Sequence, residues 1–446
     1  MSVEPNAAAV EIDGRGLKKS IGLAQAVSLY VGSVLGSGVL LIPALAADVA
    51  GPASLLAWAF MSVLVVPMAL TMGLLSARYP DAGGVSNFVR LAYGPVPGAL
   101  VGWFFFISVP VGAPIVAVTG AAYLGAALYL THTSQAIVAA LILGVVLITN
   151  YLGMKAAGRM QVAMVSAILL VIILAAAGAL PRVAPEHFAP FVPFGWLSVA
   201  QAAAIMFWCF IGWEAVTHLS EEFVDPQRDV MRSVIISIVV VGVMYFAVAL
   251  ATVGTASYGL EKSSASLAVM MRDTMGPVAA WVTGITALFI CVATANAYVG
   301  AASRVGFALA RAGAAPRILG YLHPAHSTPV VSLAFIAVGA GITLWLITGG
   351  IVGLKELIVF PNATFMATYI GGCLAGTRLL ADNRWGRLMA WIALFATTGV
   401  YFFLGWAALV PPVVIVMALL LKRLIPGSNG RANVPETPGP PRRHSG

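Results

Sequence analysis

A short stretch near the N-terminus, GSVLGSGVLLIPA at residues 32–44, contains residues that are unsuited to an uninterrupted helix. It places Gly36, Ser37 and Gly38 together inside an apolar run that is long enough to cross a membrane. Glycine has no Cβ, so it weakens a helix and lets a ligand approach the backbone. If the helix unwinds here, the amides of Ser37 and Gly38 suit a carboxylate, because they lie at the positive end of the second half-helix. The carbonyls freed on the first half-helix suit a cation such as an ammonium group.

A second unusual stretch, FWCFIGWEA at residues 207–215, combines Gly212 with Glu214 in a later apolar run. We place Glu214 well inside a membrane span, where a carboxylate costs several kcal/mol unless it is partnered or protonated. Glu214 would accept a proton or steady an unwound helix. The alternative is that it caps backbone amides and locks helix packing. Among the neighbouring aromatic residues, Trp208 is the candidate to cover an apolar pocket.

Close helix packing is the alternative explanation for the first stretch, because Gly32 and Gly36 have the Gly-xxx-Gly spacing that is common between membrane helices. A pair of interrupted apolar helices at corresponding positions of two halves is instead typical of secondary transporters built from inverted repeats. The second stretch lies five spans after the first, and an inverted repeat requires such an odd number. The pair therefore favours ligand binding over packing.

Membrane-spanning helices must position these residues. The chain has 446 residues, of which 60% are hydrophobic and 9% are charged, whereas soluble proteins average about 25% charged residues. A span needs about 20 apolar residues. The sequence predicts an all-α integral membrane protein with twelve transmembrane helices, at 21–48, 53–77, 97–130, 134–153, 160–180, 196–219, 233–255, 276–303, 329–349, 353–376, 386–403 and 405–421.

The basic residues predict the orientation, because cytoplasmic loops carry an excess of Lys and Arg. With the N-terminus inside, 20 of the 24 Lys and Arg residues fall on the cytoplasmic side, Arg304 and Arg311 among them. Both termini are therefore expected in the cytoplasm. The net charge of +8 indicates contact with anionic membrane lipid rather than with nucleic acid.

Short loops join most spans, so we expect one membrane domain and no sizeable soluble one. Its predicted parts are a cytoplasmic segment at 1–20, two five-helix repeats at 21–180 and 196–376, helices eleven and twelve at 386–421, and a disordered cytoplasmic tail at 426–446. The three cysteines have no paired spacing and the six histidines no i, i+4 pair, so neither a disulfide nor a metal site is predicted. Thr294 and Asn296 are expected to form interhelical hydrogen bonds.

Four segments carry a likeness to a known family. They are GSGVLLIPALAA at 36–47, YPDAGGVSNFVRLAYG at 79–94, FWCFIGWEAVTHLSEEFVDPQRD at 207–229 and ARAGAAP at 310–316. Over nearly its whole length the chain resembles the amino acid-polyamine-organocation superfamily of transporters. Within it, SVPVGAP at 108–114, FWCF at 207–210 and ANAYVGAASR at 295–304 resemble the bacterial exporters of methionine and branched-chain amino acids.

The resemblance implies a LeuT-type fold, with a 5+5 inverted repeat followed by two helices, in the bacterial inner membrane. It also implies the roles of the site residues. The substrate-binding residues would be Val34, Gly36, Ser37, Gly38, Trp208, Ile211 and Tyr298. Amides of Ser37 and Gly38 would bind the carboxylate, and Tyr298 would contact the side chain. Carbonyls of Val34, Trp208 and Ile211 would bind the amino group. Glu214 matches an acid that relatives use in proton-linked or conformational roles.

The sequence departs from the family pattern in two places. Met231 stands where many relatives have a proline, and residues 161–174 lack the lysine that some proton-coupled members carry. Direct replacement of a sodium ion by that lysine is therefore not supported. No cofactor is expected, proton coupling stays open, and the sequence identifies neither the coupling ion nor the oligomeric state.

These features predict a secondary transporter that moves a neutral, apolar amino acid such as methionine, leucine, isoleucine or valine by alternating access. A cationic substrate needs a second acid in the pocket, and only Glu214 is available. Export is implied by the subfamily likeness alone, so an importer is one alternative. An antiporter of cationic amino acids or polyamines is the other. A receptor is disfavoured by the two interrupted helices, and an intramembrane enzyme by the lack of a catalytic constellation at membrane depth.

Overall fold

The described residues of the computed structural model, 17–36, 38–259 and 276–424, form α-helices joined by short 3-10 helices and loops. The α-helices are α1 (Leu23–Val34), α2 (Gly38–Ala50), α3 (Ser54–Arg78), α4 (Val85–Tyr93), α5 (Pro95–Leu128), α6 (His132–Tyr151), α7 (Met154–Ala179), α8 (Trp196–Met206), α9 (Trp213–Thr217), α10 (Pro226–Gly254), α12 (Ala279–Arg311), α13 (Val330–Thr348), α14 (Leu354–Leu379), α15 (Arg384–Tyr401) and α16 (Val410–Leu424). The predicted disordered tail at 426–446 and most of the segment 1–20 lie outside the described residues.

Within the described part of the chain, eight helices are long and apolar enough to cross a membrane, or nine if the bent pair formed by α15 and α16 is one span. The prediction of an all-helical membrane protein is therefore confirmed, whereas twelve spans stay a prediction. Two of the predicted spans are divided into shorter pieces. Their first pieces, α1 with 12 residues and α8 with 11, are shorter than the roughly 20 residues that cross a bilayer.

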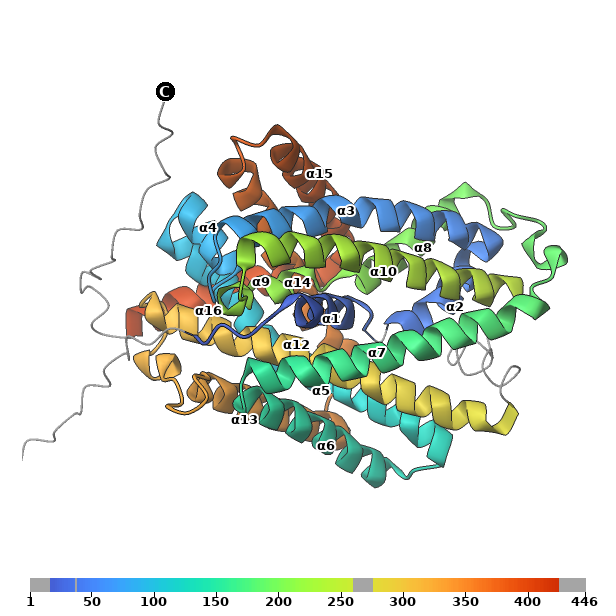
Figure 1. Cartoon of the computed structure of the whole chain (residues 1–446), viewed down its shortest axis with the longest axis horizontal. Coiled ribbons are helices and arrows are strands. Elements are labelled where there is room, and N and C mark those ends of the chain that lie inside the picture. Colours follow the sequence, from blue (N-terminus) through green and yellow to red (C-terminus); the bar gives the residue numbers. More distant parts are fainter. Residues whose placement is uncertain (1–16, 37, 260–275, 425–446) are drawn as a thin grey trace, which may run out of the picture.

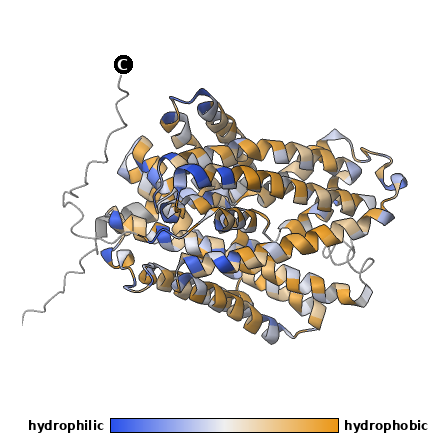
Figure 2. Ribbon diagram, viewed as in Figure 1, coloured by the Kyte–Doolittle hydropathy of each residue, from blue (hydrophilic) through white to orange (hydrophobic). Residues whose placement is uncertain are grey.

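The long helices lie alongside one another, and the short α1 lies in their midst (Figure 1). Hydrophobic residues dominate along the helices, and hydrophilic residues gather at the end of the bundle where α4 lies (Figure 2). The fraction of buried residues distinguishes inner helices from outer ones. In the most apolar stretch of α12, 83% of the residues are buried, against 22% in α6 and 28% in α13. The inner helices, which include α1, α5 and α12, are therefore the ones that can line a site.

Several helix ends differ from the predicted spans by five residues or more. The span predicted at 233–255 begins at Pro226, because the Asp225 side chain accepts a hydrogen bond from the Arg228 amide at 3.2 Å and proline suits the first turn. The span predicted at 276–303 continues to Arg311. The last span, predicted from residue 405, is a 3-10 helix up to Leu409 and an α-helix from Val410.

The extension of α12 places Arg304, which follows the predicted span at 276–303, inside a helix. Arg304 is fully buried inside the helix, and its Nε donates to Glu222 Oε1 at 2.6 Å. A buried guanidinium is tolerated only when a partner compensates its lost hydration. Glu222 supplies that partner, and hydropathy along the chain does not reveal it.

Candidate functional site

The first apolar segment is interrupted where the sequence predicted it. Helix α1 ends at Val34, and α2 begins at Gly38. The carbonyl of Gly32, which an unbroken helix would pair with an amide four residues later, accepts a hydrogen bond from the Thr294 hydroxyl at 3.0 Å. Side chains of neighbouring helices thus replace part of the missing backbone bonding.

The second segment is interrupted as well. Helix α8 ends at Met206, residues 207–210 form a 3-10 helix, and α9 begins at Trp213. Between them Gly212 has a φ of +137°, a conformation that side chains rarely adopt. A Cβ at Gly212 would lie 2.8 Å from the Ser33 carbonyl oxygen, so this glycine is required both by its backbone angle and by the close approach of α1.

The two interruptions contact each other directly. The Ser33 hydroxyl donates to the Gly212 carbonyl at 3.1 Å, and a Cβ at Gly38 would lie 2.5 Å from Cys209 Sγ. The two unwound regions therefore form one local structure, although they are far apart in the sequence.

Tyr245 of α10 joins the two interruptions and was not identified from the sequence. Its hydroxyl reaches the Val34 carbonyl at 2.8 Å and the Cys209 carbonyl at 3.0 Å, one at the end of α1 and the other in the 3-10 helix. Its ring stacks on Trp58 with the centroids 5.0 Å apart. A signal was available, since a tyrosine deep in an apolar span needs a hydrogen-bond partner there.

Glu214 is fully buried and accepts hydrogen bonds from neutral donors. Its Oε2 accepts from the Gly212 amide at 2.9 Å and its Oε1 from the Tyr298 hydroxyl at 3.1 Å. The Tyr369 hydroxyl accepts from the Gly212 amide at 3.1 Å and from the Glu214 amide at 3.2 Å. The contact with Gly212 matches the alternative in which Glu214 caps backbone amides.

A cavity of about 80 Å³ lies beside the interruptions. Its lining comes from both unwound regions and from α5, α12 and α14. The lining residues are Ser33, Val34, Gly36, Gly38, Val109, Gly112, Ala113, Ile115, Val116, Cys209, Ile211, Thr294, Ala295, Tyr298, Ile358, Pro361 and Phe365.

The structure brings together most of the predicted substrate-binding residues. Val34, Gly36, Gly38, Ile211 and Tyr298 all line the cavity. The structure does not show whether the other two predicted residues line the cavity. Ser37 lies outside the described residues, and Trp208 lies in the 3-10 helix with only its backbone described.

Glu214 is not among the residues that line the cavity. Tyr298 lies between them, because its hydroxyl bonds the carboxylate while the residue itself lines the cavity. Its ring packs against Phe365 with the centroids 5.2 Å apart. Tyr298 therefore connects Glu214 to the cavity.

The predicted interhelical bonds of Thr294 and Asn296 are confirmed. The Thr294 hydroxyl bonds α1, as described above, and Asn296 bonds α7 through Gln161, whose Oε1 accepts at 2.7 Å. Asn150 of α6 donates to the Asn296 side chain at 2.9 Å. The Gln161 amide in turn donates to the Ser28 carbonyl of α1 at 3.3 Å. A buried chain of amide side chains thus ties α1 to α6, α7 and α12.

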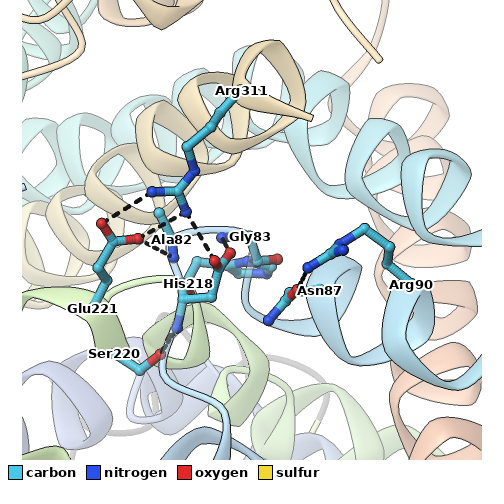
Figure 3. Close-up of polar contacts among 9 residues, drawn as sticks. Ala82, Gly83, Asn87, Arg90, His218, Ser220, Glu221 and Arg311 are labelled. Carbon is cyan, nitrogen blue, oxygen red and sulfur yellow. Dashed lines mark hydrogen bonds and ion pairs between the residues drawn. The ribbon is translucent and has the colours of Figure 1, made fainter. Parts of the chain in front are cut away.

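A cluster of charged side chains lies away from the cavity, at the end of the bundle that includes the loop before α4. We call it the charged end and define it by Asp81, Glu221, Glu222, Arg304 and Arg311. The Arg311 side chain lies between Glu221 and the loop of Ala82 and Gly83 (Figure 3). Its Nη2 is 3.0 Å from Glu221 Oε2 and 2.8 Å from Asp81 Oδ2. Burial raises the pKa of the Asp81 carboxyl, and the nearby Arg311 charge opposes that rise.

The start of the described chain packs on this charged end. The Ser20 amide donates to the Glu222 carbonyl at 2.8 Å, and the Val224 amide donates to the Ile21 carbonyl at 3.0 Å. The loop after α9 is therefore held from two sides, by the segment before α1 and by Arg311 of α12.

The chain is similar to amino acid permeases over most of its length. The profile of the amino acid permease family matches residues 21–422. An uncharacterized amino acid permease of Bacillus subtilis, YecA, is 36% identical over 400 residues, which cover 89% of this chain and 94% of that protein.

Two relatives with assigned substrates extend the match. The L-methionine/branched-chain amino acid exporter YjeH of Escherichia coli is 32% identical over 420 residues, covering 92% of this chain and 98% of that protein. The branched-chain amino acid permease BcaP of Bacillus subtilis is 25% identical over 377 residues, covering 80% of each chain.

Proposed function

The chain belongs to the amino acid permease family and is therefore an amino acid transporter rather than an enzyme; on this premise we propose that it exports neutral, apolar amino acids. Methionine, leucine, isoleucine and valine are the proposed substrates. Export is proposed because the relative that is 32% identical over most of both chains is an exporter of methionine and branched-chain amino acids.

The observation that carries the proposal is the composition of the cavity wall. Among the described residues that line the cavity there is no Asp, Glu, Lys, Arg or His. A charged substrate side chain would lose its hydration there without gaining a partner, which costs several kcal/mol. An aliphatic or thioether side chain loses nothing by entering such a pocket and gains from leaving water.

The unwound regions suit the two charges that every such substrate carries. Amides of Ser37 and Gly38 are proposed for the α-carboxylate, because the N-terminus of a helix such as α2, which begins at Gly38, favours an anion. Carbonyls of Val34, Trp208 and Ile211 are proposed for the α-amino group. Tyr245 already bonds the Val34 carbonyl, and a carbonyl oxygen has a second lone pair for an ammonium group.

The proposed architecture is a LeuT-type fold of twelve spans, with two five-helix repeats at 21–180 and 196–376 and two further helices. The interruptions would then occupy equivalent places in the two repeats, as expected of transporters that alternate access around a central site. The charged end is proposed to face the cytoplasm, together with both termini, in keeping with the distribution of Lys and Arg.

Counterflow in proteoliposomes tests the substrate class. The purified chain should exchange labelled leucine for unlabelled methionine, isoleucine or valine, and not for arginine or putrescine. Exchange with arginine or putrescine in place of leucine would identify the cationic antiporter instead. No exchange with any amino acid would contradict the proposal as a whole.

Direction requires a separate measurement in cells. Cells loaded with a methionine dipeptide should release methionine faster when they produce the chain than when they produce the Gly38→Val variant. Faster accumulation of external methionine, with unchanged release, would identify an importer.

Glu214 is proposed to couple transport to protons or to conformational change. Glu214→Gln keeps the shape and an accepting oxygen but cannot ionise, so the pH dependence of counterflow should flatten if the carboxyl carries a proton. Unaltered pH dependence with retained activity would leave Glu214 the structural role of capping the Gly212 amide.

A further inference from the structure

Part of the cavity wall belongs to α5 and α14. On α5 four of the five lining residues, Val109, Gly112, Ala113 and Val116, have the i, i+3, i+4, i+7 spacing of one helix face. On α14 the lining residues are Ile358, Pro361 and Phe365. Since the unwound regions suit the charged groups of an amino acid, this wall and Tyr298 are left to contact its side chain.

Gly112 leaves a gap in this wall. A Cβ at Gly112 would lie 3.7 Å from Pro361 Cβ and 4.0 Å from Pro361 Cγ, which is ordinary van der Waals distance, and these are the contacts that it would make within 4 Å. A methyl group therefore fits between α5 and α14 at this point, and among the described residues only Pro361 comes within 4 Å of it.

At two other positions of α5, glycine is required for close helix packing. A Cβ at Gly120 would lie 2.8 Å from Cys291 Cβ, and a Cβ at Gly102 would lie 2.8 Å from Leu309 Cδ2. At these positions glycine lets a neighbouring helix approach closely. Helix packing does not require a glycine at 112, so its small size serves the cavity.

On the α14 side of the gap, Pro361 is a rigid residue. Proline has one ring and no rotatable side chain, and it lies inside α14, where its ring constrains the local backbone. Because close-packed helices resist small increases in volume, the distance between Gly112 and Pro361 should set how large a side chain can enter.

We infer that the gap between Gly112 and Pro361 receives the tip of the substrate side chain, and that these two residues set the upper size limit of the amino acids that the protein transports. This inference rests on the proposed function. It goes beyond it by naming the residues that select leucine and methionine over larger aromatic amino acids.

The test is a competition profile in proteoliposomes. Labelled alanine counterflow is measured against unlabelled alanine, valine, leucine, methionine and phenylalanine for wild type, Gly112→Ala, Gly112→Val and Pro361→Ala. One methylene in an apolar pocket changes discrimination by about 10-fold or more. Gly112→Ala should therefore weaken competition by leucine and methionine about 10-fold while alanine is unchanged, and Gly112→Val should extend the loss to valine.

Pro361→Ala provides the reverse change. Removing the ring enlarges the gap, so phenylalanine should compete better than it does in wild type. Gly144→Ala is the matched control, because a Cβ at Gly144 has nothing within 4 Å and lies outside the cavity lining. Its profile and melting temperature should equal those of wild type.

The outcomes separate this inference from the proposed function. Equal losses for alanine and leucine in Gly112→Ala, at an unchanged melting temperature, would overturn the inference while leaving the transporter intact. An unchanged leucine-to-alanine ratio in every variant would also overturn it. If wild type itself exchanges no neutral amino acid, the proposed function is wrong and the inference falls with it.

Discussion

The interrupted helices and the charged end both hold backbone segments that are not in regular helices, but they do so with different chemistry. Around the interruptions the partners are the hydroxyls of Ser33, Thr294 and Tyr245, and the Glu214 carboxylate accepts from neutral donors. At the charged end Arg311 pairs with two acids, and its side chain is 37% exposed.

The difference follows from the surroundings. Opposite charges attract strongly in a medium of low dielectric constant, but removing them from water costs as much or more. Neutral hydroxyl groups satisfy carbonyls at membrane depth without that cost. At the charged end water is near, so ion pairs form and break at small cost. The hydrogen bonds of the central site therefore favour a fixed geometry, whereas the exposed ion pairs of Arg311 at the charged end can open at small cost.

Arg304 and Glu222 are the exception, because this ion pair of the charged end is buried. Glu222→Ala should give the largest effect, about 3–5 kcal/mol of lost stability, since it leaves a buried guanidinium without its partner. Thermal unfolding in detergent measures the loss. The double variant Arg304→Met with Glu222→Leu should recover most of it, and a wild-type melting temperature for Glu222→Ala would contradict the assigned burial.

Gly38→Val tests the central site. Its added Cβ would lie 2.5 Å from Cys209 Sγ, so we expect about 1–3 kcal/mol of lost stability from overpacking and no counterflow, with membrane insertion intact. Gly38→Ala combined with Cys209→Ala is the companion variant. Recovered transport in that double variant would show that the clash, rather than the approach of the carboxylate to the backbone, decides the phenotype. Normal leucine counterflow by Gly38→Val would contradict the assignment of Gly38.

Tyr245→Phe tests whether neutral hydrogen bonds hold the interruptions together. The ring and its stacking on Trp58 are kept, while the carbonyls of Val34 and Cys209 lose their shared donor, which should cost about 1–3 kcal/mol. Melting temperature and counterflow should both fall. Tyr401→Phe at the end of α15 is the control, because it removes a hydroxyl that bonds the Ala408 carbonyl of the following 3-10 helix at 2.8 Å. It should leave counterflow unchanged. Full activity of Tyr245→Phe would refute the bridging role.

Arg311→Gln should give the smallest effect on stability, because its partners are partly exposed. Such pairs contribute about 0.2–1 kcal/mol, and salt screens them. The difference in melting temperature between wild type and Arg311→Gln should therefore shrink as sodium chloride is added. A difference that is independent of salt would mean that the pair acts as a buried one, and the contrast between the two regions would fail.

Several features were predictable from the sequence because they depend on residue type alone. Long apolar runs predicted helices in a membrane, and glycines at positions 36, 38 and 212 predicted where two of them break. The lone acid Glu214 was correctly singled out as a buried group. In each case the local chemistry is costly enough in lipid that few structures can accommodate it.

The tertiary structure decided how these parts meet. Helix α5 is apolar along most of its length, so its sequence did not reveal which face, that of Val109 to Val116, lines the cavity. The sequence did not reveal the position of Glu214 behind Tyr298 or the burial of Arg304. At Tyr245 it signalled the need for a hydrogen-bond partner but not the two carbonyls that the hydroxyl joins. Hydropathy measures how much a residue avoids water, and it carries no information on which of several apolar neighbours a side chain will contact. That choice depends on the packing of distant helices, which only the folded chain determines.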